Sequence, residues 1–334
     1  MRWFIRRAIT AAITIFASLT IIFFLVRVMP GNPIDMMVAQ LIMQGLDPEE
    51  AYRRVMAMVP FVPTDPLWKQ YIDYIIGFLK GDLGRSIHYG APVTTILTYG
   101  IPWTVFLVSI SLIISFSLGV IIGMYIAYKR GGILDRFLSI FSSVTRAIPP
   151  YVIGILVVLI FALQLKLFWD PVRRSPILGP YDPRIQPGFT LEFISSVLYY
   201  AILPVASYVI TTFGAWALQM KSSTVSVLGE YYVMAAEARG LPERRIVISY
   251  VGRNAILPLF TSLAISIGHI FSGSVFIETI FSYPGIGRFI SASISNRDYM
   301  VISGCFLLIV VAVVLSNLFA DLLYGKLDPR IRFR

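Results

Sequence analysis

Runs of about 20 apolar residues recur along this chain, and they restrict its fold more than any other feature. A helix of that length crosses the hydrocarbon core of a bilayer, where backbone N–H and C=O groups find no water to bind. The runs lie near residues 8–29, 101–127, 148–168, 198–220, 255–281 and 301–324. With 57% hydrophobic and only 14% charged residues, the composition excludes a soluble domain of 334 residues. The sequence therefore predicts an all-α integral membrane protein with six transmembrane helices.

The first apolar run follows Arg2, Arg6 and Arg7, as the apolar part of a secretory signal peptide would. It is longer than the usual apolar part of such a peptide, and no small-x-small cleavage site precedes Pro30. We therefore expect residues 1–29 to form a retained signal-anchor helix rather than a cleaved signal peptide.

Basic residues are distributed unevenly between the two sides that six spans define. One side holds both termini and consists of residues 1–7, 128–136, 221–254 and 325–334. The other consists of residues 30–100, 169–197 and 282–300. The first side has 15 Lys and Arg among 60 residues, and the second has 10 among 119. Because cytoplasmic loops are enriched in Lys and Arg, we expect a multi-pass plasma-membrane protein with both termini in the cytoplasm.

The segments between the runs suggest the domain organisation. Residues 30–100 are expected to form an extracytoplasmic insert of short helices. Residues 101–324 are expected to form a five-helix core that includes a cytoplasmic loop at 221–254, and residues 325–334 a cytoplasmic tail. Residues 169–197, rich in Pro, Gly and Arg, indicate an irregular external loop.

Several classes of function are disfavoured by the residues. The net charge of +10 arises from basic residues in short loops beside apolar runs, so no nucleic-acid partner is expected. The single Cys305 allows no internal disulfide and suggests no metal site. No GxxxxGK[ST], HExxH or GxSxG motif occurs, so we expect no enzyme and no bound nucleotide in this chain.

The cytoplasmic stretch from 229 to 254 has the pattern of two helices joined at a glycine. Ala235, Ala236 and Ala238 favour a first helix over 229–239, and Gly240 lies where a left-handed cap commonly ends a helix. Pro242 suits the first turn of a second helix. The first helix would present Tyr231, Met234, Ala235 and Ala238 within an arc of about 100°. This small, apolar face suits a partner's groove, headgroups of the membrane, or the protein's own bundle.

Strings along nearly the whole chain resemble permeases of ABC importers, in the form found in the dipeptide and oligopeptide group. They are "MPGNP" (29–33), "GDLGRSI" (81–87), "IPPYVIG" (148–154), "ARGLPERR" (238–245), "RNAILP" (253–258), "ETIFSYPGIGR" (278–288), "NRDY" (296–299) and "LDPRIR" (327–332). The stretch around Gly240 resembles the EAA loop of that family. Short strings such as "GDLG" are unspecific alone, but eight in one order identify the chain as a member.

The resemblance implies a six-helix permease in a heteromeric importer with several partners. These are a second homologous permease, two cytoplasmic ATPase subunits that bind ATP and Mg²⁺, an extracytoplasmic solute-binding protein, and membrane lipid. It also implies ATPase coupling through the 229–250 helices. The residues expected to carry this coupling are Tyr231, Met234, Ala235, Ala236, Ala238, Gly240 and Pro242. Two positions depart from the family pattern: Met234 replaces the leading Glu, and Tyr250 stands where His is common in the peptide group.

Some alternatives stay open at the level of sequence. His269 lies in the middle of the fifth run and Glu278 near its outer end, and each suits either the pathway or gate, or a structural hydrogen bond. The insert, with Trp68 and Tyr71, either seats the solute-binding protein or stabilises the outer helix ends. The solute is expected to be a peptide, with oligosaccharides and nickel chelates as alternatives. A secondary transporter is the rival class, but it would need no ATPase-docking element.

Overall fold

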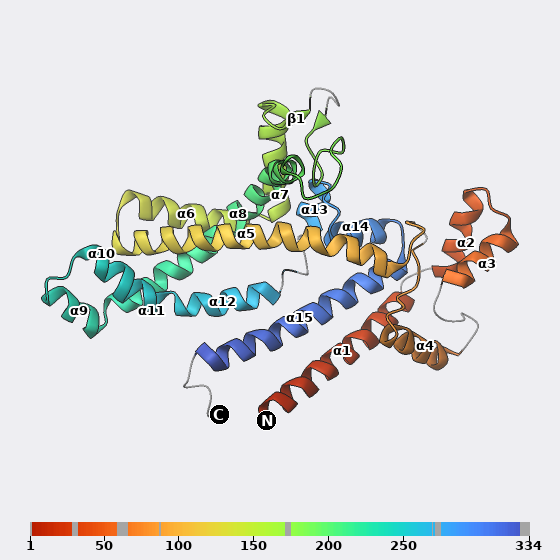
Figure 1. Cartoon of the computed structure of the whole chain (residues 1–334), viewed down its shortest axis with the longest axis horizontal. Helices are drawn as coiled ribbons and strands as arrows, with labels where there is room; N and C mark the ends of the chain where they lie inside the picture. Colours follow the sequence, from red (N-terminus) through yellow and green to blue (C-terminus); the bar gives the residue numbers. More distant parts are fainter. Residues whose placement is uncertain are drawn as a thin grey trace. The chain divides into compact units, whose positions relative to one another are not determined.

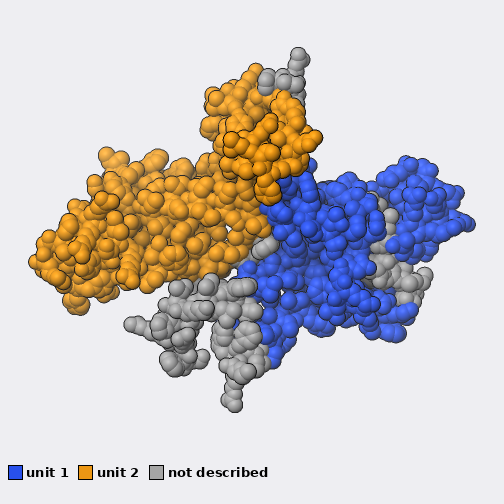
Figure 2. All heavy atoms as spheres, in the orientation of Figure 1, with its two compact units in different colours: residues 1–104, 271–275, 284–322 blue, residues 105–270, 276–283, 323–334 orange. Residues whose placement is uncertain are grey.

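The computed structural model describes residues 2–28, 33–58, 66–86, 88–170, 175–268, 270 and 275–327. The chain divides into two compact units, coloured separately in Figure 2. Unit 1 comprises residues 1–104, 271–275 and 284–322, and unit 2 comprises residues 105–270, 276–283 and 323–334. Each unit is described by itself.

Four helices are long and apolar enough to cross a membrane (Figure 1). They lie in α1 (Arg2–Val28), α5 (Val93–Tyr128), α8 (Leu191–Leu228) and α15 (Tyr299–Leu327). Two bent pairs also pass the same test, Ile133–Thr145 with Pro150–Gln164 and Glu243–Ala255 with Leu257–Ile267. Six spans result if each bent pair is one span. The all-α membrane fold is therefore confirmed, whereas the count of six stays a prediction.

Several helix boundaries differ from the predicted runs because polar residues continue the helices beyond the apolar segments. α5 begins at Val93, directly after Pro92, rather than near 101. α8 begins at Leu191, where the Thr190 hydroxyl accepts a hydrogen bond from the Phe193 N–H at 3.2 Å, and it includes the polar residues after 220. The predicted loop 169–197 is thus shorter. It contains one antiparallel pair, β1 (Trp169–Asp170) with β2 (Ser175–Pro176).

Unit 1 contains most of the predicted insert, and the expected short helices are present. They are α2 (Pro33–Met43), α3 (Pro48–Met58) and α4 (Leu67–Leu79). α2 and α3 pack together, with Met37 and Val55 beside Tyr299 of α15 in one buried cluster. α4 contacts α1, where the Tyr71 and Thr20 hydroxyl oxygens lie 2.6 Å apart.

A second part of unit 1 surrounds the start of α15. Val93 and Leu97 of α5 pack against α14 (Ile286–Ser295) and α15 in one apolar core. Asp298 caps α15, since its carboxylate accepts the Val301 N–H at 3.3 Å, and it also accepts a hydrogen bond from the Ser86 hydroxyl. Two strings that are distant in sequence, at 81–87 and 296–299, therefore meet through buried polar groups.

Within unit 2, α5 and α8 approach each other closely at two glycines. A Cβ atom added at Gly119 would lie 2.3 Å from the Trp216 Cβ, and one at Gly123 would lie 2.4 Å from the Ala217 carbonyl oxygen. Only glycine permits this approach, which is the usual role of small residues between membrane helices. Before the charged stretch at 229–255 the chain also forms α6 (Ile133–Ala147), α7 (Pro150–Val157) and the π-helical η1 (Val158–Gln164). After that stretch come α12 (Leu257–Gly268) and α13 (Val275–Ile280).

Candidate functional site

The charged stretch after α8 folds into the predicted pair of helices with a corner between them. α9 spans Tyr231–Ala238, and the second helix runs through α10 (Glu243–Arg245), the π-helical η2 (Ile246–Gly252) and α11 (Arg253–Ala255). We call residues 229–255 the elbow. The elbow lies at one end of unit 2, beside the turn from α5 to α6 (Figure 1), where Glu243 lies near Tyr128.

The corner of the elbow is a glycine cap of the predicted kind. Gly240 has a φ of +67°, in the left-handed region that side chains disfavour. Its N–H donates to the Glu237 carbonyl at 2.9 Å, and the Leu241 N–H donates to the Ala236 carbonyl at 3.4 Å. These two bonds form a Schellman motif, which satisfies carbonyl groups that the end of α9 would otherwise leave unpaired. The turn therefore depends on Gly240 and on its N–H.

Pro242 lies one position earlier than the sequence pattern placed it. It is the N-cap of α10 rather than part of its first turn, and its carbonyl accepts the Arg245 N–H at 2.8 Å. Glu243 lies in the first turn of α10, where the helix dipole favours a negative charge. Pro242 is exposed, so it shapes the corner from outside the core of unit 2.

One face of α9 is held inside unit 2. Val233 and Ala236 are buried together with Ile246 and Val251 of the second helix, and Leu241 packs against this cluster. The cluster joins the two helices of the elbow through side chains from both. Ala236 therefore differs from the other predicted coupling residues, because it lies against the elbow's own second helix and not at its surface.

The other face of α9 is open. Tyr231 is 85% exposed and Met234 46% exposed, and Ala235 and Ala238 are exposed with them. These four residues, which we call the open face, are those that the helical period placed in one arc. Among the described residues of unit 2, no other element covers this face. A partner's groove, the membrane surface and the protein's own bundle all stay open as its occupant.

Charged side chains border the open face. Glu237 and Arg239 lie at the end of α9, and Glu243, Arg244 and Arg245 follow the corner, all exposed. An apolar centre with a polar, charged rim is the usual anatomy of a protein–protein contact. Tyr250, at the position where the family pattern favours His, is partly buried against the Val233 cluster and therefore faces inward.

Polar contacts fix the end of α8 to α6 and to the end of the elbow. Lys221, near the end of α8, forms an ion pair with Asp135 of α6 and donates to the Ser139 hydroxyl at 3.1 Å. The Ser223 hydroxyl donates to the Ala255 carbonyl at 2.6 Å, which ties α8 to the end of the second helix. The sequence reasoning missed these contacts. The charged residues Asp135 and Lys221 beside apolar runs were the available signal.

The two residues predicted for the pathway or gate have different outcomes. His269 lies outside the described residues. Glu278 lies in α13 of unit 2 and is fully buried. A buried carboxylate in a membrane helix needs a partner, and Tyr208 of α8 lies near it. Its role in a gate stays a prediction.

The insert residues singled out from the sequence point in different directions. Tyr71 faces α1, where its ring packs edge-on to Phe23 at a centroid distance of 5.2 Å. Trp68 is 66% exposed. Tyr71 therefore packs against α1 within unit 1. Of these two residues, Trp68 is the one whose side chain is exposed to a partner or to the membrane.

Comparison with known proteins covers the whole chain. The model of the family described as "Binding-protein-dependent transport system inner membrane component" matches residues 119–333. The dipeptide transport system permease protein DppB of Escherichia coli is 31% identical over 100% of both chains. The di/tripeptide transport system permease protein DppB of Pseudomonas aeruginosa is 31% identical over 98% of both. The oligopeptide transport system permease protein AppB of Bacillus subtilis is 29% identical over 100% of both.

Proposed function

The chain belongs to the family of binding-protein-dependent transport system inner membrane components, and from this membership we infer that it is the permease subunit of a peptide ABC importer. Its relatives are named as transport permeases and not as enzymes. Dipeptides and oligopeptides are the proposed solutes because the names of full-length relatives specify them. Oligosaccharides and nickel chelates are the alternatives from the wider family.

We propose that this subunit forms half of the translocation pathway and that its partners supply the energy and the solute. The second half would come from a homologous permease, and two cytoplasmic ATPase subunits would bind ATP and Mg²⁺. An extracytoplasmic solute-binding protein would deliver the peptide. The density of basic residues supports an orientation with both termini and the elbow in the cytoplasm, where ATP is present.

The elbow is proposed as the element that receives work from an ATPase subunit. The open face would enter a groove of the ATPase, since Ala235 and Ala238 allow close approach while Tyr231 and Met234 supply apolar area. The observation that carries this proposal is the division of α9 into two faces, one open and one locked into the elbow by Val233 and Ala236. A helix that merely filled unit 2 would bury both.

The contacts of the elbow suit a rigid lever. The Gly240 cap and the Val233 cluster connect α9 to the second helix, and the Ser223–Ala255 bond connects that helix to α8. A displacement of α9 would therefore pass to α8 and α12 rather than be absorbed at the corner. ATP would shift the permease between inward-open and outward-open states by binding one global state more tightly than the other.

The insert is proposed to help seat the solute-binding protein. α3 carries exposed charged side chains, among them the Glu49–Arg53 and Glu50–Arg54 pairs, which suit a polar docking surface. Photocrosslinkers at two positions test this proposal. Arg53 lies in the insert, and Lys129 is the control because the proposed orientation places it in the cytoplasm. Crosslinks to the binding protein should form from Arg53 and not from Lys129, and none from Arg53 in any nucleotide state would refute the role of the insert.

Substitution at Ala238 tests the coupling proposal. Ala238→Trp adds bulk to the open face without touching the buried cluster, and Ala238→Ser at the same position keeps the face small. We expect Ala238→Trp to abolish copurification of the ATPase subunits and peptide uptake, while membrane insertion and thermal unfolding stay at wild-type values. Ala238→Ser should behave as wild type. Normal uptake by Ala238→Trp would contradict docking through this face, and uptake by the purified chain without ATPase subunits would favour a secondary transporter.

A further inference from the structure

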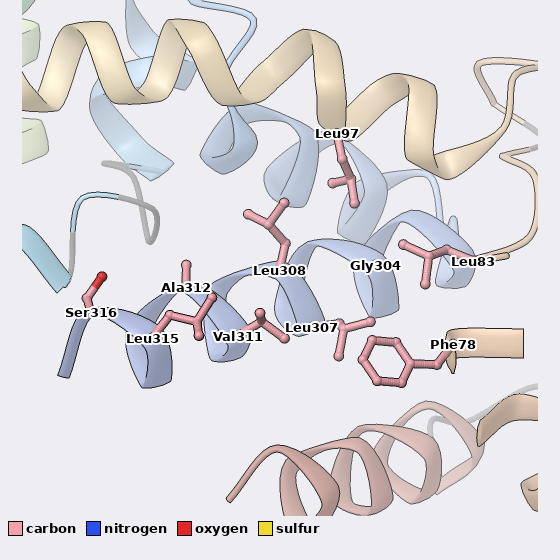
Figure 3. A pocket seen from close by; sticks show the side chains of 10 residues that line it. All are labelled: Phe78, Leu83, Leu97, Gly304, Leu307, Leu308, Val311, Ala312, Leu315 and Ser316. Atoms are coloured by element: carbon pink, nitrogen blue, oxygen red, sulfur yellow. The ribbon is translucent and has the colours of Figure 1, made fainter. Parts of the chain in front are cut away.

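A narrow apolar groove of about 510 Å³ lies in unit 1 along α15. Its floor is the helical stripe Gly304, Leu307, Val311, Ala312 and Ser316, with Phe78 of α4 and Leu83 at the Gly304 end (Figure 3). Of its lining residues, all of which the structure describes, Ser316 alone has a polar side chain. Such a groove in a membrane protein offers nothing to water or to a polar solute, and it suits hydrocarbon.

The dimensions of the groove fit one lipid chain. From Gly304 to Ser316 the rise of an α-helix gives a length of about 18 Å, close to the roughly 15 Å that one leaflet contributes to a bilayer core of about 30 Å. A hydrocarbon chain one carbon wide can lie along this stripe at contact distances of about 4 Å.

α4 indicates where the membrane surface meets this groove. Trp68, Ile72, Ile76 and Leu79 lie within an arc of about 80° and are all exposed, while Tyr71 on another face contacts α1. A helix with an exposed apolar stripe and a Trp is typical of one that lies in the headgroup region of a bilayer. Since Phe78 of the same helix closes the groove, that end of the groove lies at headgroup level.

An exposed lysine follows α4 at this end of the groove. Lys80 is exposed one residue beyond α4, between Phe78 and Leu83 in the sequence. Two further charged residues follow: the Asp82 carboxylate accepts the Gly84 N–H at 3.0 Å, and Arg85 donates to the Gly90 carbonyl at 3.2 Å. Asp298, which accepts a hydrogen bond from Ser86, adds a second carboxylate to this region. Lys80 is exposed and stands nearest in sequence to the groove residues, so it is the cation available to a phosphate.

We propose that the α15 groove binds one acyl chain of a phospholipid, with the lipid phosphate beside the Lys80 ammonium group. The orientation under the proposed function places this lipid in the extracytoplasmic leaflet. Binding of the lipid to the groove does not depend on the transported solute. The site would anchor the outer end of α15 to α4 through a lipid rather than through direct side-chain contact.

Photolabelling of the full chain in its native complex tests the site. The complex is reconstituted in phosphatidylethanolamine–phosphatidylglycerol vesicles that contain a trace of phosphatidylglycerol with a diazirine on one acyl chain. Label should concentrate on the peptide that covers 304–316. Ala312→Phe, which fills the groove, should lower this label at least fivefold, and Val313→Phe, at a neighbouring position that does not line the groove, should leave it unchanged. Equal labelling of wild type and Ala312→Phe would overturn the proposal.

Two further arms separate the headgroup from the chain and the lipid from a protein. Lys80→Gln should lower labelling about fivefold, Lys80→Arg should restore it, and a diazirine diacylglycerol without phosphate should label the wild type about fivefold less. Equal labelling by diacylglycerol would overturn the role of Lys80. A disulfide from Val311→Cys to a second permease subunit would show that protein covers the groove and would refute the lipid. None of these measurements depends on transport, so they stand apart from any test of the proposed function.

Discussion

Replacement of Gly240 tests whether the corner of the elbow must keep its shape for coupling. An added Cβ at Gly240 would meet no atom within 4 Å, so a small side chain costs only backbone strain. At a φ of +67°, alanine costs about 1–2 kcal/mol relative to glycine, whereas asparagine tolerates this region. A cost of that size lowers the ratio of capped to uncapped corner about 5- to 30-fold.

Proline at the same position combines two losses. Its ring fixes φ near −65°, which the corner cannot accept, and it removes the N–H that donates to Glu237. The lost hydrogen bond alone is worth about 1 kcal/mol, and the forced change of direction adds to it. We therefore expect coupling to fall in the order Gly240, Gly240→Asn, Gly240→Ala, Gly240→Pro, with the proline variant uncoupled.

Peptide-stimulated ATP hydrolysis by the reconstituted complex, normalised to the amount of permease inserted in the membrane, measures this series. The amount of permease inserted in the membrane and the free energy of unfolding of α5 and α8 should not change, because the corner lies outside the α5–α8 contact. Wild-type coupling in Gly240→Pro would refute the rigid corner. An asparagine variant weaker than the alanine variant would show that backbone conformation is not the cause.

Two further substitutions separate the buried parts from the exposed ones. Val233→Ala removes two buried methyl groups and should lower the free energy of unfolding of the elbow by about 2 kcal/mol, measured by hydrogen exchange at the 231–251 amides. Tyr231→Ala should weaken ATPase copurification and leave that free energy unchanged. Equal loss of amide protection in both variants would contradict a helix with one buried and one open face. Asp298→Ala removes the cap of α15 and leaves the buried Ser86 hydroxyl without its acceptor, so hydrogen exchange should show the start of α15 destabilised by about 1–2 kcal/mol. Asp298→Asn keeps a capping oxygen and should lose less stability. An asparagine variant as unstable as the alanine variant would argue against capping.

The predictions that succeeded depended on residues close together in sequence. Apolar length predicted the long helices because a bilayer forces the chain to satisfy its own backbone groups. Gly240 predicted the corner because its backbone preference is a property of the residue itself. The period of 3.6 residues predicted which α9 residues share the open face.

Local sequence could not predict the features that distant residues decide. The helical period places Ala236 on a different face from Ala235, but only the packing of Ile246 and Val251 shows that this face is the buried one. The sequence left the role of Tyr71 open, and the structure packs it against Phe23 and Thr20 of α1. The start of α5 at Val93 follows from a polar region that folds as helix because its neighbours in unit 1 cover it.

The sequence by itself determined that this chain is a helical membrane protein with a bent, charged elbow, because hydropathy, glycine conformation and helical period are local properties. Only the tertiary structure decided which side of α9 is held and which is offered, since burial depends on segments that meet after folding. The same holds for the Ser86–Asp298 contact and for the groove beside α15, whose walls come from parts of unit 1 that are far apart in the chain.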